Sequence, residues 1–281
     1  MKRPAPAEAP PNARAPAFLV VFDFDWSLIN ENSDTFVVGV LDPAGKIWAA
    51  AEKKHDEGVQ WTALMDWVVS ELHAVGHTAA DMEAALGRVP VLSTVLSAVT
   101  LAQERGAELR ILSDANTLYI RWILAALGLS DVFSMTVTNP AEVDPDGRLR
   151  ISPHQPSEGA PHGCLHCPSN LCKGAVMQGW LDEMGSAARV AYVGDGGGDF
   201  CPCTRMARGD TVFARRKPHD RLLRKCRQLP RRPGAARVVA RVVEWGDPDD
   251  GGPSLADGFR AFFEPAGDDV PRAAEAACTA S

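Results

Sequence analysis

The chain carries acidic side chains that directly follow apolar, strand-like runs, together with a serine and a lysine. These residues are Asp23 and Asp25 after the run 18–22, Ser113 and Asp114 at the end of 108–113, Lys173 at the start of a predicted helix, and Asp195 and Asp199 after 189–194. Carboxylates hold Mg²⁺ with few protein ligands and leave its other positions to water and phosphate oxygens. A carboxylate can also attack phosphorus, while a second acid protonates the leaving group and a lysine and a hydroxyl hold the phosphoryl oxygens. Together these residues predict phosphoryl-transfer chemistry, whereas each alone is equally typical of a turn, a helix cap or a solvated surface.

The elements around these residues have to bring them to one place. Residues 18–22 are continuously apolar, which is typical of a strand buried on both faces of a parallel sheet. Further strands are predicted at 108–113, 132–138, 189–194, 211–214 and 237–243, alternating with helices at about 91–105, 116–127, 172–184 and 219–228. This alternation predicts an α/β fold with a Rossmann-like parallel sheet flanked by helices. Ligands of such sheets bind outside the carboxyl ends of the strands, so we expect the acids to converge there.

Two segments interrupt the alternation. Residues 34–88 have apolar spacings near the helical period and predict a small helical insert after the first strand, in which Trp48, Trp61 and Trp67 are expected to pack between helices. Residues 139–170 are rich in Pro, Gly and His and predict a long functional or disordered loop. The expected organisation is a disordered lead-in (1–16), an α/β core (17–33 and 89–245), the insert (34–88) and a tail (246–281) with one helix around 259–263.

Composition excludes several classes of protein. The 281 residues include 29 Lys and Arg against 36 Asp and Glu, and the net charge of −7 argues against a basic nucleic-acid binder. The longest nearly apolar stretch, 89–102, is shorter than the ~20 residues that span a bilayer, and the amino terminus lacks the apolar region of a secretory signal. Seven cysteines, an odd number, argue against a disulfide scaffold. We expect a cytoplasmic protein with no nucleic-acid or membrane partner, and the oligomeric state stays open.

Four motifs in chain order resemble a known group of enzymes. They are Asp23-Phe-Asp25 with Asn30-Glu-Asn-Ser-Asp34, Leu112-Ser-Asp-Ala-Asn-Thr117, Cys167-Pro-Ser-Asn-Leu-Cys-Lys-Gly174, and Tyr192-Val-Gly-Asp-Gly followed by Asp199-Phe-Cys-Pro202. Their order resembles the haloacid dehalogenase superfamily of phosphohydrolases. In detail they resemble the phosphoethanolamine/phosphocholine phosphatase family, which includes relatives acting on pyridoxal phosphate, thiamine monophosphate or pyrophosphate. The similarity runs from about Phe18 to Trp245.

The resemblance implies a role for each catalytic residue. Asp23 would be the nucleophile and Asp25 the general acid and base. Ser113 and Lys173 would hold the phosphoryl group. Asp195, together with Asp23 and the backbone carbonyl of Asp25, would bind Mg²⁺, the one cofactor that the resemblance implies.

The remaining implied roles concern support and substrate binding. Asp199 would support the metal ligands, although a helix N-cap is the alternative for this residue. Asp34 and Asp114 would face the amine or choline end of the substrate, and Asn116 is predicted beside them as a substrate contact. Two carboxylates suit a cationic group electrostatically. The insert 34–88 matches the helical cap of such enzymes, which closes over the site.

The sequence departs from the family pattern at three positions near the site. Ser27 stands where a threonine is usual, a bulky Trp26 precedes it, and Gly198 replaces a residue with an amide side chain. We expect an Mg²⁺-dependent phosphatase acting on a small phosphomonoester, with phosphoethanolamine or phosphocholine favoured over pyridoxal phosphate, thiamine monophosphate and pyrophosphate. The alternative is a catalytically weak phosphate-binding or regulatory protein of the same fold. A phospho-accepting receiver module is disfavoured by the length, the insert and the paired acids after Val193.

Two further groups of residues have alternative interpretations. His162, Cys164, His166, Cys167 and Cys172 are either structural residues beside the site or a zinc or redox-sensitive centre, because Cys164-x-x-Cys167 has the spacing of metal ligands. No second pair follows at the spacing of a zinc finger, and Cys201-Pro-Cys203 lies apart in the chain. Arg215 and Lys217, just past a predicted strand, are either solvated or contacts for an anionic substrate.

Overall fold

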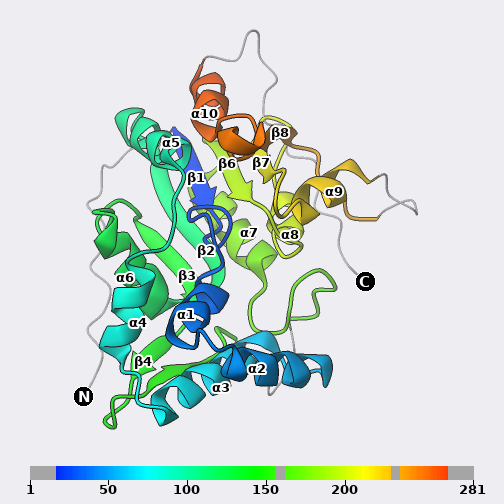
Figure 1. The fold of residues 1–281 in the computed structure, drawn as a ribbon. Helices are drawn as coiled ribbons and strands as arrows, with labels where there is room; N and C mark the ends of the chain where they lie inside the picture. The colour runs from blue at the N-terminus through cyan, green and yellow to red at the C-terminus, as the bar shows by residue number, and fades with distance from the viewer. Residues whose placement is uncertain (1–16, 156–161, 229–234, 265–281) are drawn as a thin grey trace, which may run out of the picture.

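A six-stranded parallel sheet forms the centre of the protein (Figure 1). The computed structural model describes residues 17–155, 162–228 and 235–264, so the predicted lead-in 1–16 lies outside the described residues. The strands run in the order β3-β2-β1-β6-β7-β8. Their bounds are Phe18–Phe22 (β1), Glu108–Asn116 (β2), Met135–Asn139 (β3), Arg189–Gly194 (β6), Thr211–Arg215 (β7) and Arg241–Trp245 (β8). The predicted α/β class and parallel sheet are confirmed.

Strand β1 shows why its sequence is continuously apolar. Its side chains alternate between two hydrophobic clusters, Val20 and Phe22 facing one and Leu19 and Val21 the other. All four are fully buried, and burial of each stabilises the fold by about 1.5–3 kcal/mol. Helices α5 (Ser93–Glu104), α6 (Thr117–Ala126) and α10 (Leu255–Phe263) pack into the first cluster. Helices α7 (Lys173–Met184), α8 (Phe200–Cys203) and α9 (Arg221–Arg227) pack into the second.

Helix α10 belongs to the core. The ring of Phe259 lies 5.9 Å from that of Phe22 on β1 and 5.0 Å from that of Phe213 on β7. Gly258 permits this approach, because a Cβ there would stand 2.7 Å from the ring of Phe213. The core therefore extends to Phe263 and does not end at residue 245. The helix also begins earlier than predicted, since Ser254 caps its first turn.

Four helices follow β1 at the carboxyl edge of the sheet (Figure 1). They are α1 (Ser33–Leu41), α2 (Lys46–Asp56), α3 (Trp61–Ala74) and α4 (Ala79–Leu86), and we call them the helical insert. Their apolar side chains, such as Val37 and Leu64, share one continuous hydrophobic cluster with β1 and β2. No helix within the described residues is both long and apolar enough to cross a membrane.

The segment predicted as a loop, 139–170, contains a short antiparallel hairpin. Its strands are β4 (Ala141–Val143) and β5 (Leu149–Ile151), and Asp144 accepts backbone hydrogen bonds across the turn. Asp66 on α3 accepts a hydrogen bond of 2.9 Å from the Ile151 amide and pairs with Arg148 and Arg150. Strands of three residues show too little hydrophobic alternation to be recognised in the sequence. The contacts with Asp66 on the helical insert stabilise the hairpin. Strand β8 likewise lies a few residues later than predicted, and a short 3₁₀ turn (Pro248–Asp250) follows it.

Candidate active site

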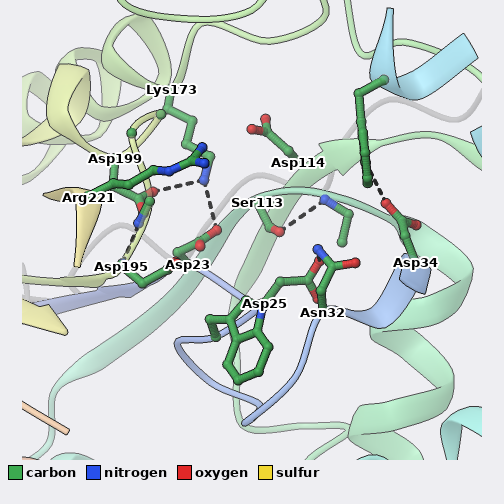
Figure 2. A pocket seen from close by; sticks show the side chains of 16 residues that line it. Asp23, Asp25, Asn32, Asp34, Ser113, Asp114, Lys173, Asp195, Asp199 and Arg221 are labelled. Carbon is green, nitrogen blue, oxygen red and sulfur yellow. Dashed lines mark hydrogen bonds and ion pairs between the residues drawn. The ribbon is translucent and has the colours of Figure 1, made fainter. Parts of the chain in front are cut away.

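The loops that follow β1 and β6 and the last residues of β2 line a cavity of about 300 Å³ together with parts of α1, α3, α7 and α9. Its polar side chains come from distant parts of the sequence (Figure 2). They are Asp23, Asp25, Asn32, Asp34, Ser113, Asp114, Lys173, Asp195, Asp199 and Arg221. Because parallel strands β2, β1 and β6 are neighbours, their carboxyl ends deliver these groups to one place.

A buried lysine joins two of the carboxylates. Lys173 Nζ, on the first residue of α7, lies 2.8 Å from Asp23 Oδ1 and 2.9 Å from Asp199 Oδ1. Burial alone would lower the pKa of Lys173, but the negative charges of Asp199 and Asp23 raise it well above its usual range. Lys173 is therefore a permanent cation beside Asp23, where it can hold an anionic group.

Asp199 is fully engaged with the protein. Its Oδ1 also accepts a 2.7 Å hydrogen bond from the Tyr192 hydroxyl, and its Oδ2 accepts from the backbone amides of Asp195 (3.2 Å) and Gly196 (2.9 Å). Asp199 stands at the N-cap position of α8, as the alternative expected, but its side chain makes no capping hydrogen bond to that helix. The Asp199 carboxylate instead holds two groups in place: the loop after β6 and the side chain of Lys173.

Asp23 and Asp195 are buried close together, and their acidity reflects this. Burial and the charge of Asp199 raise the pKa of Asp23 to about 7, although Lys173 opposes the shift. Burial, with the charges of Asp199 and Asp23, raises the pKa of Asp195 to about 9. Carboxylate oxygens of Asp23, Asp195 and Asp199 lie within 4.8 Å of one another. Such a set of hard oxygens fits Mg²⁺. Both oxygens of Asp199 accept hydrogen bonds, whereas Asp23 and Asp195 are engaged through Oδ1, so the Oδ2 atoms of Asp23 and Asp195 are the better placed to bind the ion.

Asp25 lies in a tight loop after β1. Its carboxylate accepts hydrogen bonds from the Ser33 amide (2.9 Å) and Asn32 Nδ2 (3.2 Å). Burial and the charge of Asp34 raise the pKa of Asp25 well above its usual range. A raised pKa favours the protonated carboxyl group, which can donate its proton, and this suits a general acid.

A second pair of acids lies farther along the cavity. Asp34 on α1 accepts a 2.8 Å hydrogen bond from Trp61 Nε1 on α3. Asp114 at the end of β2 has a buried Oδ1 with no hydrogen-bond partner among the described residues. The charge of Asp114 raises the pKa of both Asp23 and Asp34, and Figure 2 shows Asp114 between Lys173 and Asp34. The cavity thus runs from the lysine past Asp114 to Asp34.

Comparison with known proteins assigns the chain to a family. The pattern of the family described as Putative Phosphatase matches residues 18–255. The chain belongs to this family. It is a phosphatase, and the predicted resemblance to the phosphoethanolamine/phosphocholine phosphatase family is confirmed.

Individual relatives of this phosphatase differ in their stated substrates. Inorganic pyrophosphatase 2 of Arabidopsis thaliana is 35% identical over 239 residues, which cover 83% of this chain and 80% of the relative. The phosphoethanolamine/phosphocholine phosphatase of Homo sapiens is 32% identical over 238 residues, covering 82% and 85% of the two chains. Among solved structures, the HAD family hydrolase t0658 of Salmonella enterica serovar Typhi aligns with a TM-score of 0.51 at 15% identity, covering 70% of this chain and 63% of the other. That likeness shows the fold.

The structure brings together nearly all the residues that the sequence marked in this phosphatase. Asn116 is the exception. It does not line the cavity; its Oδ1 accepts a 3.0 Å hydrogen bond from the Tyr119 amide and caps α6. Asn116 is therefore a helix cap, because β2 continues past Asp114 and turns the next polar side chain into the first turn of α6.

Two cavity residues escaped the sequence analysis. Trp61, expected to pack between helices, lines the cavity and donates to Asp34, while Trp48 packs edge-on against it. Arg221, on the first residue of α9, lies at the cavity and is exposed. Nothing in the local sequence distinguishes either residue from the other tryptophans and arginines. Only the packing of α3 and α9 against the sheet edge does so.

Arg215 holds the loop that carries Asp25. It is buried, and its Nη1 donates a 2.6 Å hydrogen bond to the Trp26 carbonyl while Nη2 donates to Asn30 Oδ1 and Nε to the Lys217 carbonyl. The guanidinium also lies between two rings, 5.4 Å from Trp26 and 5.0 Å from Trp245. Trp26 itself has a positive φ of 57°. Arg215 is therefore a positioning residue, neither solvated nor a contact for an anionic substrate.

We expect Arg215→Lys to lower both stability and turnover. The lysine keeps the charge but loses the planar fork, so the Trp26 carbonyl and Asn30 lose their shared donor. The free energy of unfolding should fall by about 2–3 kcal/mol, and kcat by roughly tenfold as the Asp25 loop relaxes. Urea denaturation and steady-state kinetics measure the two effects. Arg216→Lys, at an exposed arginine paired with Glu244, is the matched control; equal behaviour of the two variants would contradict the role of Arg215.

Proposed function

We propose that this phosphatase hydrolyses a small phosphomonoester with a cationic group, phosphoethanolamine or phosphocholine, through an aspartyl-phosphate on Asp23. The observation that carries the proposal is the polarity of the cavity. Lys173 and Asp23 form an ion pair in the part of the cavity that Ser113 also lines, and Asp34 lies away from them, with Asp114 between it and the lysine. A phosphate fits beside the lysine, and an ammonium group fits between the two acids.

The first half of the reaction transfers the phosphoryl group to Asp23. A carboxylate oxygen of Asp23 attacks phosphorus as the ester P–O bond breaks, while Lys173 and the Ser113 hydroxyl hold the phosphoryl oxygens. Asp25 donates its proton to the leaving alkoxide oxygen and releases the alcohol. The raised pKa of Asp25 favours the protonated form that this step needs.

The second half returns Asp23 to its starting state. Asp25, now a carboxylate, takes a proton from a water molecule whose oxygen attacks phosphorus. The bond between phosphorus and Asp23 breaks, and inorganic phosphate leaves. Asp23, Asp195 and the backbone carbonyl of Asp25 would hold Mg²⁺, which supplies positive charge to offset these carboxylates and the phosphoryl oxygens. Asp199 fixes the loop that carries Asp195.

Gly198 bears on the choice of substrate. A Cβ at this position would stand 3.5 Å from Asp114 Oδ2, so the glycine leaves that oxygen open toward the cavity. The buried Oδ1 of Asp114 has no hydrogen-bond partner among the described residues, so none of their donors satisfies this oxygen. The space that Gly198 leaves beside Oδ2 is consistent with a positively charged substrate group near Asp114.

Phosphate release from a panel of compounds tests the proposal. The panel holds phosphoethanolamine, phosphocholine, thiamine monophosphate, pyridoxal phosphate and pyrophosphate, each with Mg²⁺ and with excess EDTA. We expect Mg²⁺-dependent release with the highest kcat/KM for phosphoethanolamine or phosphocholine. Preference for pyrophosphate or pyridoxal phosphate would contradict the cationic site, and unchanged release in EDTA would contradict the metal.

The acidity of Asp34 gives a prediction about pH. Burial and the charge of Asp114 raise its pKa to about 6, against the opposing hydrogen bond from Trp61. Asp34 therefore becomes anionic as the pH rises through about 6, and KM for phosphocholine should fall across that range. Asp34→Asn should raise KM at about pH 7.5 roughly tenfold and flatten the KM profile, and any fall in kcat that follows from a lower pKa of Asp25 should be the same for a substrate without a cation.

Glycerol phosphate is the matched control substrate, because it has no cation but shares the ionisation of the phosphate. Its KM profile should be the same in the native enzyme and in Asp34→Asn. A tenfold rise in KM for both substrates would show that Asp34 acts on the phosphate end or on the fold, and not on a cationic group.

A further inference from the structure

A cluster of four cysteines lies behind the active site. The sulfur atoms of Cys164, Cys167, Cys172 and Cys201 all lie within 4.8 Å of one another, and Cys164 Sγ is 3.4 Å from Cys201 Sγ. None of the four forms a disulfide. Four thiolates around Zn²⁺, with Zn–S bonds of about 2.3 Å, stand roughly 3.8 Å apart at the corners of a tetrahedron. The spacing of the cluster matches that geometry.

From this geometry we infer that Cys164, Cys167, Cys172 and Cys201 bind a structural Zn²⁺ ion. Three of the ligands follow the spacing Cys-x₂-Cys-x₄-Cys, within the range of structural zinc sites. The fourth, Cys201, comes from α8, far away in the sequence. On binding, each thiol gives its proton to water and its sulfur donates an electron pair to the ion. The site is closed by four protein ligands, so it is structural and not catalytic.

Backbone amides lie beside three of the four sulfurs. The backbone amides of Gly174 and Ala175, in the first turn of α7, donate to Cys167 and Cys172, and the His166 amide lies 3.4 Å from Cys164 Sγ. The amino terminus of α7 adds the positive end of a helix dipole. Gly174 is required for the approach of the two helices, because a Cβ there would collide with the sulfur of Cys201. Hydrogen bonds of this kind orient and stabilise the ligands of a metal.

Neither nearby histidine is a ligand. The Cys164 amide donates to His162 Nδ1 (3.1 Å), and His162 Nε2 lies 2.9 Å from the Pro168 carbonyl, so both ring nitrogens are engaged. His166 packs its ring against Phe200. The zinc alternative that included these histidines is thus corrected: the fourth ligand is Cys201, which the sequence analysis had set apart.

The location of the cluster indicates what the ion does. Residues 162–169 form no helix or strand, none of them is buried, and Leu165 is 97% exposed, so apolar packing contributes little to holding this part of the segment before the buried Leu171. Cys172 directly precedes Lys173, and Cys201 lies two residues after Asp199. A zinc ion here would tie the segment to α7 and α8. It would thereby fix the amino-terminal ends of these two helices, from which Lys173 and Asp199 reach the cavity.

Metal analysis of the purified full-length enzyme tests the inference. We expect about one zinc ion per chain that survives dialysis against EDTA. Replacement by Co²⁺ should give the visible bands of tetrahedral cobalt and the near-ultraviolet band of thiolate ligation. Cys164→Ser and Cys201→Ser should lose the zinc and the cobalt spectrum. Cys226→Ser, at a cysteine outside the cluster, and Asp195→Asn, in the carboxylate site, should keep both.

Other outcomes would overturn the site. Protein without bound zinc or a thiolate–cobalt spectrum, iron in place of zinc, or a disulfide between Cys164 and Cys201 found by mass spectrometry without reductant would each do so. Loss of zinc in Asp195→Asn but not in Cys164→Ser would assign the ion to the carboxylates. Cys201→Ser alters a buried residue and could unfold the protein. Cys164→Ser alters a partly exposed residue, so a native circular dichroism spectrum of this variant shows that its loss of metal is not a loss of fold.

Discussion

Asp23→Asn should lower kcat by at least about 10⁴-fold while the protein stays folded. The asparagine has nearly the same shape and can still accept the hydrogen bond from Lys173, but it cannot attack phosphorus. Its neutral side chain also removes one negative charge from a buried cluster. Burial raises the pKa of Asp23 to about 7, so ionised Asp23 costs stability above that pH, and the variant should unfold at a temperature no lower than the native enzyme.

Phosphate release and thermal unfolding measure these two effects in one preparation. Asp131→Asn, at an exposed acid, makes the same chemical change away from the cavity and should leave kcat unaltered. Asp25→Asn should differ from Asp23→Asn in one respect. The leaving group of p-nitrophenyl phosphate needs little help from an acid, so with this substrate the phosphoryl group should accumulate on Asp23 of the Asp25→Asn enzyme. Mass spectrometry would detect it. A folded Asp23→Asn enzyme with native turnover would refute the mechanism.

Lys173→Met should have the largest effect on stability as well as abolishing most activity. It leaves Asp23 and Asp199 buried without their shared cation, which costs about 3–5 kcal/mol of unfolding free energy. The cost depends on pH. In the native enzyme Lys173 lowers the pKa of Asp23, so in the variant that pKa should rise above 7. Asp23 is then protonated at acid pH, and the loss of stability should be largest at about pH 8 and shrink toward pH 5.5.

Urea denaturation at the two pH values tests this prediction. Lys46→Met, at an exposed lysine on α2, is the matched control and should change stability by less than about 0.5 kcal/mol at either pH. A loss of stability for Lys173→Met that is equal at both pH values would show that packing, and not the two carboxylates, sets the cost.

The sequence by itself determined the sheet and most of the catalytic end of the cavity. Continuous apolar runs such as 18–22 predict buried parallel strands, and strands of one parallel sheet end at one edge. Asp23, Ser113 and Asp195 are therefore brought together by local position alone, since Asp23 and Asp195 directly follow their strands and Ser113 lies near the carboxyl end of β2. Lys173 is also placed by its local position. It begins α7, and a helix that leads into a strand of a parallel sheet starts at the edge where the strands end.

Only the tertiary structure decided the contacts between segments that are remote in sequence. Trp61 meets Asp34 because α3 packs across α1, and Arg215 reaches the Asp25 loop because β7 lies next but one to β1. Cys201 joins the other three cysteines because α8 packs on α7. Spacing along the chain records which residues share an element, whereas these contacts depend on how elements pack. The support of the catalytic loop and the proposed zinc site therefore became visible only in three dimensions.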